Sequence, residues 1–339
     1  MRTRDVIATI AVTGAVATFA LLNVGSVEST NFLSTPLSVA EREFINFIAE
    51  HQRSYGTKEE YQYRLEKFAD NFNYIQDFNA NNEETELGIN MFADLTEYEF
   101  SQRLGKKSSP FESEDDSEVE IHEGLDFSST PSSWDWTKKG AVSHVKDQGG
   151  CGSCWAFAGV ATLEGLYYLK HGSMKTFSEQ QMVDCVSRCS CDGGWAQSAI
   201  DHAVNHKTNS DSDYKYKGKD GSCKENNYKG YFSVKKHVNV KSKSDSALID
   251  AIHQQPTAVS VQANQRVFQF YKGGVVQEKD CGTRTDHAVT AVGYDSDSIK
   301  IKNSWGSGWG EKGYIRLARN KKGGSGTCGV YTDSCYPVA

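Results

Sequence analysis

Two cysteines three positions apart, Cys151 and Cys154, stand where an apolar run begins, and their type and spacing could do chemistry. A Cys-x-x-Cys pair can serve as a redox couple, as half of a zinc site, or as one nucleophile beside one structural thiol. The run from Cys154 to Gly172 is apolar nearly all round, which predicts a buried helix beginning at Cys154. The positive end of a helix dipole favours a thiolate, so Cys154 is the better candidate for the reactive thiol.

A thiolate nucleophile also needs a base and a group that orients the base. Among the nine histidines, His287 heads an apolar, β-favouring run, and Asn303 closes another short predicted strand sixteen residues later, close to Trp305. An Asn side chain can accept a hydrogen bond from one imidazole nitrogen and fix the tautomer, and Trp305 could exclude water from that bond. Each residue alone is a weak signal. Together they predict a nucleophile, a base and an orienting group in the order Cys, His, Asn.

The first 26 residues are typical of a secretory signal, with a basic start and no charge from Val6 to Val27. A signal anchor is the alternative, because the uncharged stretch is just long enough to span a bilayer. Export implies an oxidising compartment, in which most of the nine cysteines should be disulfide-bonded. The odd number leaves one candidate reactive thiol. A zinc site that combines Cys151 and Cys154 with Cys189 and Cys191 is the rival interpretation, and the export signal argues against it.

Residues 38–79 have helical periodicity and divide at Gly56 into two predicted helices. The first has an apolar side formed by Phe44, Ile45, Phe47 and Ile48. In the second, six residues spaced three or four apart share one stripe: Glu60, Arg64, Phe68, Asn71, Ile75 and Asn79. Residues 105–129 follow, with seven acids between Glu112 and Glu123, and they predict an exposed, cleavable linker.

The charge is unevenly distributed along the chain. Residues 1–129 contain 10 Lys and Arg against 24 Asp and Glu, whereas residues 130–339 contain 27 against 20. An acidic first half and a basic second half suggest that one binds the other, although two independently solvated faces are the alternative. We interpret the lysines clustered between Lys215 and Lys243 as a solvated face or a surface for the acidic half, and not as a nucleic-acid site.

These patterns resemble a known family. Cys151-Gly-Ser-Cys154-Trp155, with His287 and Asn303 lying 133 and 149 residues after Cys154, resembles the signature of the papain and cathepsin cysteine proteases. The helical stripe resembles the ERFNIN signature of cathepsin L-type propeptides, and a second propeptide element, G-x-N-x-F-x-D, resembles Gly88, Asn90, Phe92 and Asp94. The resemblance covers about residues 38–100 and 130–339 and implies a cathepsin L-type cysteine endopeptidase zymogen.

The resemblance implies roles for single residues. Cys154 would attack the scissile carbonyl as a thiolate paired with protonated His287, and Asn303 would orient the imidazole. Gln148 and the Cys154 backbone N–H would form the oxyanion hole. Asp333 corresponds to the floor of the S2 pocket, where it could pair with a basic P2 side chain or turn to solvent and leave the pocket apolar. The substrate-binding set is Gly193, Gly194, Trp195, Ala196, Ser260, Ala288, Trp305 and Asp333.

Disulfides and fold are implied in the same way. The family pairs are Cys151–Cys191, Cys185–Cys223 and Cys281–Cys328, and an additional pair, Cys189–Cys335, would leave only Cys154 free. The expected fold is α+β, with a helical domain, a β-barrel-like domain and an active-site cleft between them. A helical propeptide domain precedes these two. The expected division is a signal at 1–26, an inhibitory propeptide at 27–129 with its inhibitor domain at about 38–100, and a peptidase domain at 130–339.

The expected partners are protein and peptide substrates, the chain's own propeptide as an intramolecular inhibitor, and cystatin-like inhibitors. The enzyme is expected to be a monomer in the secretory pathway, in a lysosome or digestive vacuole, or outside the cell. It is expected to need no metal or other cofactor, no nucleic acid, and no membrane once the signal is removed. Two other functions compete. A catalytically inert papain-like binding protein should lack a catalytic group, and a Cys-x-x-Cys oxidoreductase would leave His287, Asn303 and the propeptide motifs unexplained.

Overall fold

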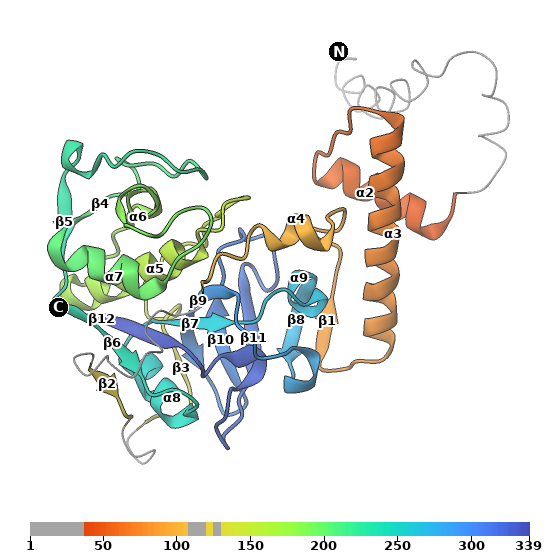
Figure 1. Ribbon diagram of the computed structural model, residues 1–339. Coiled ribbons are helices and arrows are strands. Elements are labelled where there is room, and N and C mark those ends of the chain that lie inside the picture. Colours follow the sequence, from red (N-terminus) through yellow and green to blue (C-terminus); the bar gives the residue numbers. More distant parts are fainter. Residues whose placement is uncertain (1–36, 108–119, 125–129) are drawn as a thin grey trace, which may run out of the picture.

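The computed structural model describes residues 37–107, 120–124 and 130–339 (Figure 1). Residues 37–107 form an N-terminal unit of helices with one short strand, and residues 130–339 form a larger main unit. The main unit has a helical half and a half built on a sheet, which confirms the expected α+β class. Within the described ranges no helix is long and apolar enough to cross a bilayer. The predicted signal at residues 1–26 lies outside the described residues.

Helix α2 (Val39–Glu50) opens the N-terminal unit. It begins with a capping box, in which the Ser38 hydroxyl accepts the Glu41 N–H at 3.2 Å and the Glu41 carboxylate accepts the Ser38 N–H at 2.7 Å. The expectation that this helix reaches Gly56 is wrong, because Gln52 has a φ of 51° and breaks the helical path. Its predicted apolar side is also narrower than expected, since Ile45 is 43% exposed.

Helix α3 (Lys58–Ala80) carries the predicted stripe, and its side chains hold the rest of the unit. Phe68, Asn71 and Ile75 are buried. The Asn71 amide donates to Ala93 O at 2.9 Å, and the Asn79 amide makes two bonds to the backbone of Leu87, at 2.9 and 2.8 Å. These bonds fix β1 (Thr85–Leu87) and α4 (Glu97–Ser101) beside the long helix (Figure 1).

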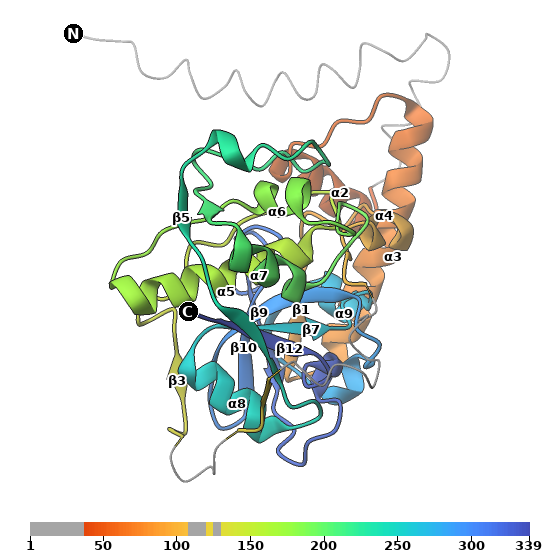
Figure 2. The ribbon, with the colours of Figure 1, turned by 60° about the vertical axis from the view of Figure 1, so that its left-hand side comes forward.

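Three helices form one half of the main unit: α5 (Cys154–His171), α6 (Glu179–Cys185) and α7 (Ala196–Asn205). Figures 1 and 2 both show them gathered on one side of the sheet. Helix α5 is buried on most of its circumference and ends at Gly172, whose φ of 69° is the left-handed conformation that glycine adopts readily. The predicted helix is therefore confirmed at both ends.

The other half is a ten-stranded mixed sheet whose main path runs β1-β8-β11-β10-β9-β7-β12-β6-β2. Strand β3 (Trp134–Asp135) pairs with β9 off this path, and β4 (Thr208–Asn209) pairs with β5 (Gly230–Phe232) in a separate small sheet. Helices α8 (Asp245–Gln254) and α9 (Arg266–Gln269) connect strands of this half. The path strands are β2 (Ile121–His122), β6 (Lys236–Val240), β7 (Thr257–Val261), β8 (Tyr271–Val276), β9 (His287–Tyr294), β10 (Ser298–Lys302), β11 (Tyr314–Ala318) and β12 (Ser334–Val338).

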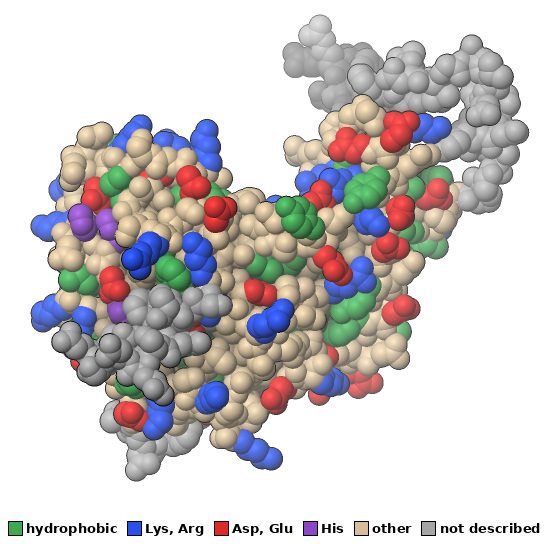
Figure 3. Space-filling model, viewed as in Figure 1, with side chains coloured by type: hydrophobic (Ala, Val, Ile, Leu, Met, Phe, Trp, Pro, Cys, Tyr) green, Lys and Arg blue, Asp and Glu red, His purple; other side chains and the backbone are tan. Residues whose placement is uncertain are grey.

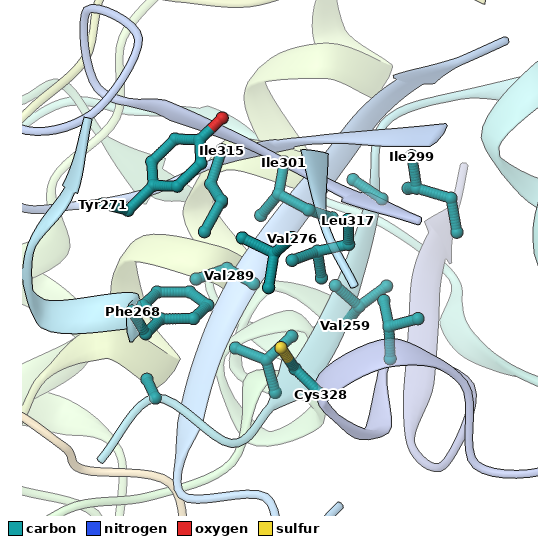
Figure 4. Packing of buried hydrophobic residues seen from close by; sticks show 14 of the residues in the cluster. Val259, Phe268, Tyr271, Val276, Val289, Ile299, Ile301, Ile315, Leu317 and Cys328 are labelled. Atoms are coloured by element: carbon teal, nitrogen blue, oxygen red, sulfur yellow. The ribbon is translucent and has the colours of Figure 1, made fainter. Parts of the chain in front are cut away.

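Two apolar clusters fill the protein. One lies around α5, α6 and α7, and the larger one lies on the sheet, where Val289, Ile301 and Leu317 point toward one another (Figure 4). The sheet cluster continues into the N-terminal unit through Phe92 and Phe100. Burial of such side chains is the main stabilising contribution to both folding and docking. The N-terminal unit therefore shares a core with the main unit.

Ion pairs also join the acidic first half to the basic second half. Four acids that precede residue 130 contact lysines of the main unit: Glu84–Lys279, Glu86–Lys272, Glu120–Lys236 and Glu123–Lys241. These contacts support the predicted charge complementarity and the interpretation of the lysine cluster. All eight side chains are at least half exposed, so each pair contributes little by itself. Charges of both signs are intermixed on the visible face (Figure 3).

The structure contains the three family disulfides, Cys151–Cys191, Cys185–Cys223 and Cys281–Cys328. The Cys151–Cys191 bond excludes the four-cysteine zinc site, because two of the four cysteines proposed as zinc ligands are joined in a disulfide. The predicted Cys189–Cys335 bond is absent, and both residues are buried free thiols. Cys189 contacts Trp195 and Ser198 at the start of α7, whereas Cys335 lies on β12 near Asp201, so the two thiols have different neighbours.

Candidate active site

Helix α5 carries Cys154 at its first position. The N-cap residue, Ser153, caps no backbone N–H; its hydroxyl pairs with the Tyr216 hydroxyl at 2.6 Å instead. The Cys154 side chain is buried, and its sulfur accepts the Ala288 N–H from the start of β9 at 3.5 Å. The thiol therefore lies where the helical half meets the sheet.

His287 and Asn303 meet because their strands are neighbours. Strand β9 begins at His287 and its antiparallel partner β10 ends at Lys302, so both residues lie at the same end of the pair. His287 Nε2 donates to Asn303 Oδ1 at 2.8 Å. Nδ1 of His287 is buried and has no partner among the described residues, so it is left as a proton acceptor. Trp305 stacks on the imidazole with ring centroids 4.7 Å apart and shields this bond.

Gln148 is buried beside the thiol. Its Oε1 accepts the Ser304 hydroxyl at 2.6 Å, which fixes the orientation of the amide. Its Nε2 then donates to the carbonyl oxygens of Cys151 at 2.9 Å and Arg103 at 2.8 Å. Arg103 belongs to the N-terminal unit, so the amide predicted for the oxyanion hole already donates to a peptide carbonyl.

Residues 103–107 of the N-terminal unit cross the site. Gly194 N donates to Gly105 O at 2.8 Å and Lys107 N donates to Gly194 O at 3.1 Å, which makes a parallel bridge. The expected contact of Gly193 and Gly194 with a peptide backbone is thus made by the chain itself, and a Cβ at Gly193 would lie 2.6 Å from Gly105 O. The expected exposed linker is wrong at residues 105–107, because this backbone is paired.

The closest approach occurs at Gly105. A Cβ there would lie 1.7 Å from the backbone oxygen of Gly152, and backbone cannot move aside as a flexible side chain can. Gly105→Ala should weaken the seating of this segment by about 1–3 kcal/mol. We expect the intact variant to hydrolyse a small peptide substrate at neutral pH about 10- to 100-fold faster than the intact wild type. Gly56→Ala, in an open part of the same unit, is the matched control. Equal background rates in all three proteins would contradict the prediction.

The electrostatic state of the site differs from the one expected. Complete burial raises the pKa of Cys154 to about 11 and lowers the pKa of His287 to about 4. At neutral pH both groups are uncharged while the N-terminal unit covers them. The expected thiolate–imidazolium pair is therefore not formed in this state, because desolvation disfavours both charges.

The residues predicted for the S2 pocket come together beside this segment. Asp333 accepts the Gln197 amide at 2.8 Å and the Ser260 hydroxyl at 3.0 Å, and its carboxylate lies 3.5 Å from Lys106 Nζ. Asp333 does not turn to solvent; its side chain is 20% exposed. Of the other predicted residues, Trp195 faces Lys107 Nζ at 5.7 Å, and Ala196 and Ala288 are buried in the α5–α7 cluster.

Sequence reasoning missed the partners that hold these groups. Ser304 orients Gln148, and Gln197 orients Asp333. It also missed a buried cluster of four charges, Lys146, Glu164, Glu179 and Lys302, which lines a small cavity beside Asn303. A signal for this cluster was available: Glu164 is the only charge in the run from Cys154 to Leu169.

Comparison with known proteins gives a consistent picture. Residues 130–338 match the papain family of cysteine proteases, and residues 44–100 match the cathepsin propeptide inhibitor domain. Ananain from Ananas comosus is 39% identical over 304 residues, which cover 88% of this chain and 87% of ananain. A recombinant stem bromelain precursor of solved structure is 38% identical with a TM-score of 0.81, covering 89% of this chain and 99% of that one. A bromelain protease from Ananas comosus, solved in complex with the inhibitor E64, is 42% identical with a TM-score of 0.59, covering 61% and 99% of the two chains.

Proposed function

The chain belongs to the papain family of cysteine proteases and is the zymogen of a cysteine-type endopeptidase, and from this membership we propose that Cys154, His287, Asn303 and Gln148 perform the reaction. The N-terminal unit is its propeptide, which inhibits the enzyme intramolecularly, and the main unit is its peptidase domain. The observation that carries the assignment is the bond from His287 Nε2 to Asn303 Oδ1, which leaves the buried Nδ1 without a partner among the described residues. The next residue, Ala288, donates its N–H to the Cys154 sulfur at the start of α5.

The proposed reaction begins when the propeptide leaves and water reaches the site. The Cys154 thiol gives its proton to His287 Nδ1, and the helix N-terminus stabilises the thiolate. The sulfur attacks the scissile carbonyl, and the oxyanion accepts hydrogen bonds from Gln148 Nε2 and the Cys154 N–H. The imidazolium then protonates the leaving amine as the C–N bond breaks, which leaves a thioester. Water, deprotonated by the imidazole, hydrolyses the thioester and restores the thiol.

The propeptide supports a proposal about specificity. Lys106 extends its ammonium group to Asp333, which also accepts the Ser260 hydroxyl. We assign Trp195, Ala196 and Ala288 to the walls of the same pocket from the family resemblance. A basic P2 side chain of a substrate could make the same charge-assisted contact, while the apolar walls accept Phe or Leu. We therefore expect dual P2 preference.

The Asp333→Ala substitution tests this specificity. The ratio of kcat/KM for an Arg-Arg substrate to that for a matched Phe-Arg substrate should fall by about tenfold, because a partly desolvated charge pair is lost. If the substitution leaves the ratio unchanged, Asp333 does not read P2.

Maturation at acidic pH is part of the proposal, and the catalytic pair itself is not the trigger. With pKa values of about 11 for Cys154 and about 4 for His287, the covered pair holds one proton at pH 5 to 7. A thiolate–imidazolium pair also holds one proton, so its formation needs no net proton uptake. Glu99 is also excluded, because Arg64 lowers its pKa to about 2 and it stays charged near pH 4 to 5.

His51, inside the propeptide, is the proposed trigger. Burial lowers the pKa of His51, whose ring packs on Phe47 with centroids 4.9 Å apart. Protonation of this imidazole would therefore weaken the propeptide fold. Asp94, which is buried, contacts Arg53 at 3.2 Å and the Tyr55 hydroxyl at 2.9 Å. Asp94 thus holds the propeptide together and makes no direct ion pair with the peptidase domain among the described residues.

His51→Phe should lower the pH at which the zymogen processes itself. The sign follows from the lowered pKa of His51. As the pH falls below about 6.5, the unfolded propeptide binds a proton at this residue more readily than the folded propeptide does, so the folded propeptide loses stability. Phenylalanine keeps the ring contact and cannot be protonated. Gel analysis of processing from pH 7 to pH 4 measures the midpoint. His171→Phe is the control, because His171 stacks on Tyr167 at 4.1 Å in the peptidase domain. Coincident midpoints for wild type and His51→Phe would remove His51 from the mechanism.

The remaining organisation is proposed from sequence. Residues 1–26 are a signal, residues 27–129 are removed on maturation, and residues 130–339 form the mature enzyme. The enzyme is proposed to act as a monomer in the secretory pathway, in a lysosome or digestive vacuole or outside the cell, with cystatin-like proteins as further inhibitors.

Titration with the epoxide E-64 tests the proposed function. The mature enzyme should lose all activity at one mole of inhibitor per mole, and peptide mapping should place the adduct on Cys154. An inert binding protein would have no activity to lose. Reaction of Cys151 would require a free thiol there, and would overturn the assignment in favour of an oxidoreductase.

A further inference from the structure

Two short strands that precede the peptidase domain close the two ends of its sheet. Strand β1 of the propeptide pairs with β8 at one end, and β2 pairs with β6 at the other. Among the described residues strand β6 otherwise pairs only with β12, so without β2 it would be a free edge. The second contact lies at the opposite end of the sheet from the first (Figure 1). Residues 120–124, which contain β2, therefore have an attachment of their own.

The backbone of this segment extends the sheet. Asn239 N donates to Glu120 O and Lys241 N donates to His122 O, each at 3.0 Å, in parallel register. Addition of a strand to a free edge is a recurrent mode of peptide recognition, in which main-chain bonds give affinity and side-chain pockets give specificity. The linker is thus paired with the sheet here, although Glu120, Ile121 and Glu123 are exposed as expected.

His122 supplies the specific contact. Its side chain is 11% exposed, and its Nε2 lies 2.9 Å from the carboxylate of Asp250, which is 4% exposed, although the N–H does not point straight at the oxygen. Its Nδ1 lies 3.0 Å from the Tyr336 hydroxyl, and the two rings meet edge to face. A buried carboxylate and a hydroxyl thus hold one imidazole from both sides.

The flanking residues match the surface too. A Cβ at Gly124 would lie 2.8 Å from Cα of Ala247 on α8, and the φ of 82° also favours glycine. Glu120 and Glu123 pair with Lys236 and Lys241. Both pairs are exposed, so each contributes little to the affinity. Their main effect is to favour an acidic segment over a neutral or basic one.

We propose that the free edge of β6, with Asp250 and Tyr336, is a second docking site for the propeptide, specific for residues 120–124 and anchored by His122. The site takes an extended acidic peptide with a central histidine followed by an acid and a glycine. It is separate from the catalytic residues, so it stands whether or not Cys154 is the nucleophile.

Hydrogen exchange on the intact zymogen tests the proposal, in a Cys154→Ala background that prevents processing. The amides of Asn239 and Lys241 should exchange on the order of tenfold faster or more in His122→Ala, because their acceptors are lost. Amides of α5 report whether the variant is folded. Ile121→Ala is the matched control, since Ile121 is 55% exposed in the same strand. Unchanged exchange in folded His122→Ala would overturn the proposal.

Limited proteolysis gives an independent measurement. A protease that cuts after glutamate should cleave at Glu120 and Glu123 slowly in the wild-type zymogen and in Ile121→Ala, and at least severalfold faster in His122→Ala. Reversing the charges of Glu120 and Glu123 to lysine should speed hydrogen exchange of the Asn239 amide, and Lys236→Glu with Lys241→Glu should restore its protection. Equal cleavage in wild type and His122→Ala would overturn the docking site.

Discussion

Cys154→Ala should lower kcat/KM for peptide substrates by at least about 10⁴-fold, because the reaction loses its nucleophile. The substitution should leave the fold intact, because the residue is buried at the start of α5 and its sulfur accepts the Ala288 N–H at the long distance of 3.5 Å. The same zymogen should fail to process itself at pH 4 to 5. For this measurement the variant zymogen is matured in trans by a trace of the wild-type enzyme. The activity of that trace is then abolished by titration with E-64.

Cys189→Ala is the control for this loss. Cys189 is also a buried free thiol, but its neighbours are Trp195 and Ser198 at the start of α7. Its variant should therefore keep most of the activity. If Cys154→Ala matured alone at the wild-type rate, processing would not be autocatalytic. If it also hydrolysed peptides at a comparable rate, Cys154 would not be the nucleophile.

The sequence predicted the catalytic residues where each one lies at the end of a helix or strand that the residue pattern indicates. Cys154 opens an apolar helix, and His287 and Asn303 lie at the ends of apolar strands, which periodicity indicates only weakly. The resemblance to the papain and cathepsin signature made the assignment. The stripe on α3 was also predictable from its spacing. Phe68 and Asn71 are both buried, and Asn71 bonds to the backbone of Ala93, which packs against this helix.

Other features depend on contacts between segments far apart in sequence, which periodicity does not report. The charge state of Cys154 and His287 depends on burial under residues 103–107, and the acidic composition of the linker concealed the strand at Ile121–His122. The Cys189–Cys335 bond was inferred from parity alone. Parity counts thiols without placing them, and a bond requires Cα atoms within about 7 Å of each other.

Glu164→Ala should destabilise the peptidase domain by about 3–5 kcal/mol, the largest stability effect that we expect from one substitution. Glu164 is 1% exposed, and its carboxylate accepts Lys146 Nζ at 2.8 Å and the Phe177 N–H at 2.9 Å. Burial alone would raise the pKa of Glu164, but Lys146 and Lys302 hold it below its ordinary value. Removal of this carboxylate leaves Lys302 buried without its nearest opposite charge and leaves Lys146 with Glu179 and the more distant Asp211.

The loss of stability should also affect the active site. The four charges come from α5, α6, the end of β10 and the loop before Gln148, so they join the two halves of the peptidase domain beside Asn303. We expect the melting temperature of the mature enzyme to fall by roughly 10 °C. Glu164→Gln, which keeps the shape and some hydrogen bonds, should lose less. Glu278→Ala, at an exposed glutamate, should change stability by less than about 0.5 kcal/mol. If the Glu164→Ala enzyme had the same melting temperature as the Glu278→Ala control, the buried charges would contribute no net stability. This happens when the cost of desolvating ions equals their attraction.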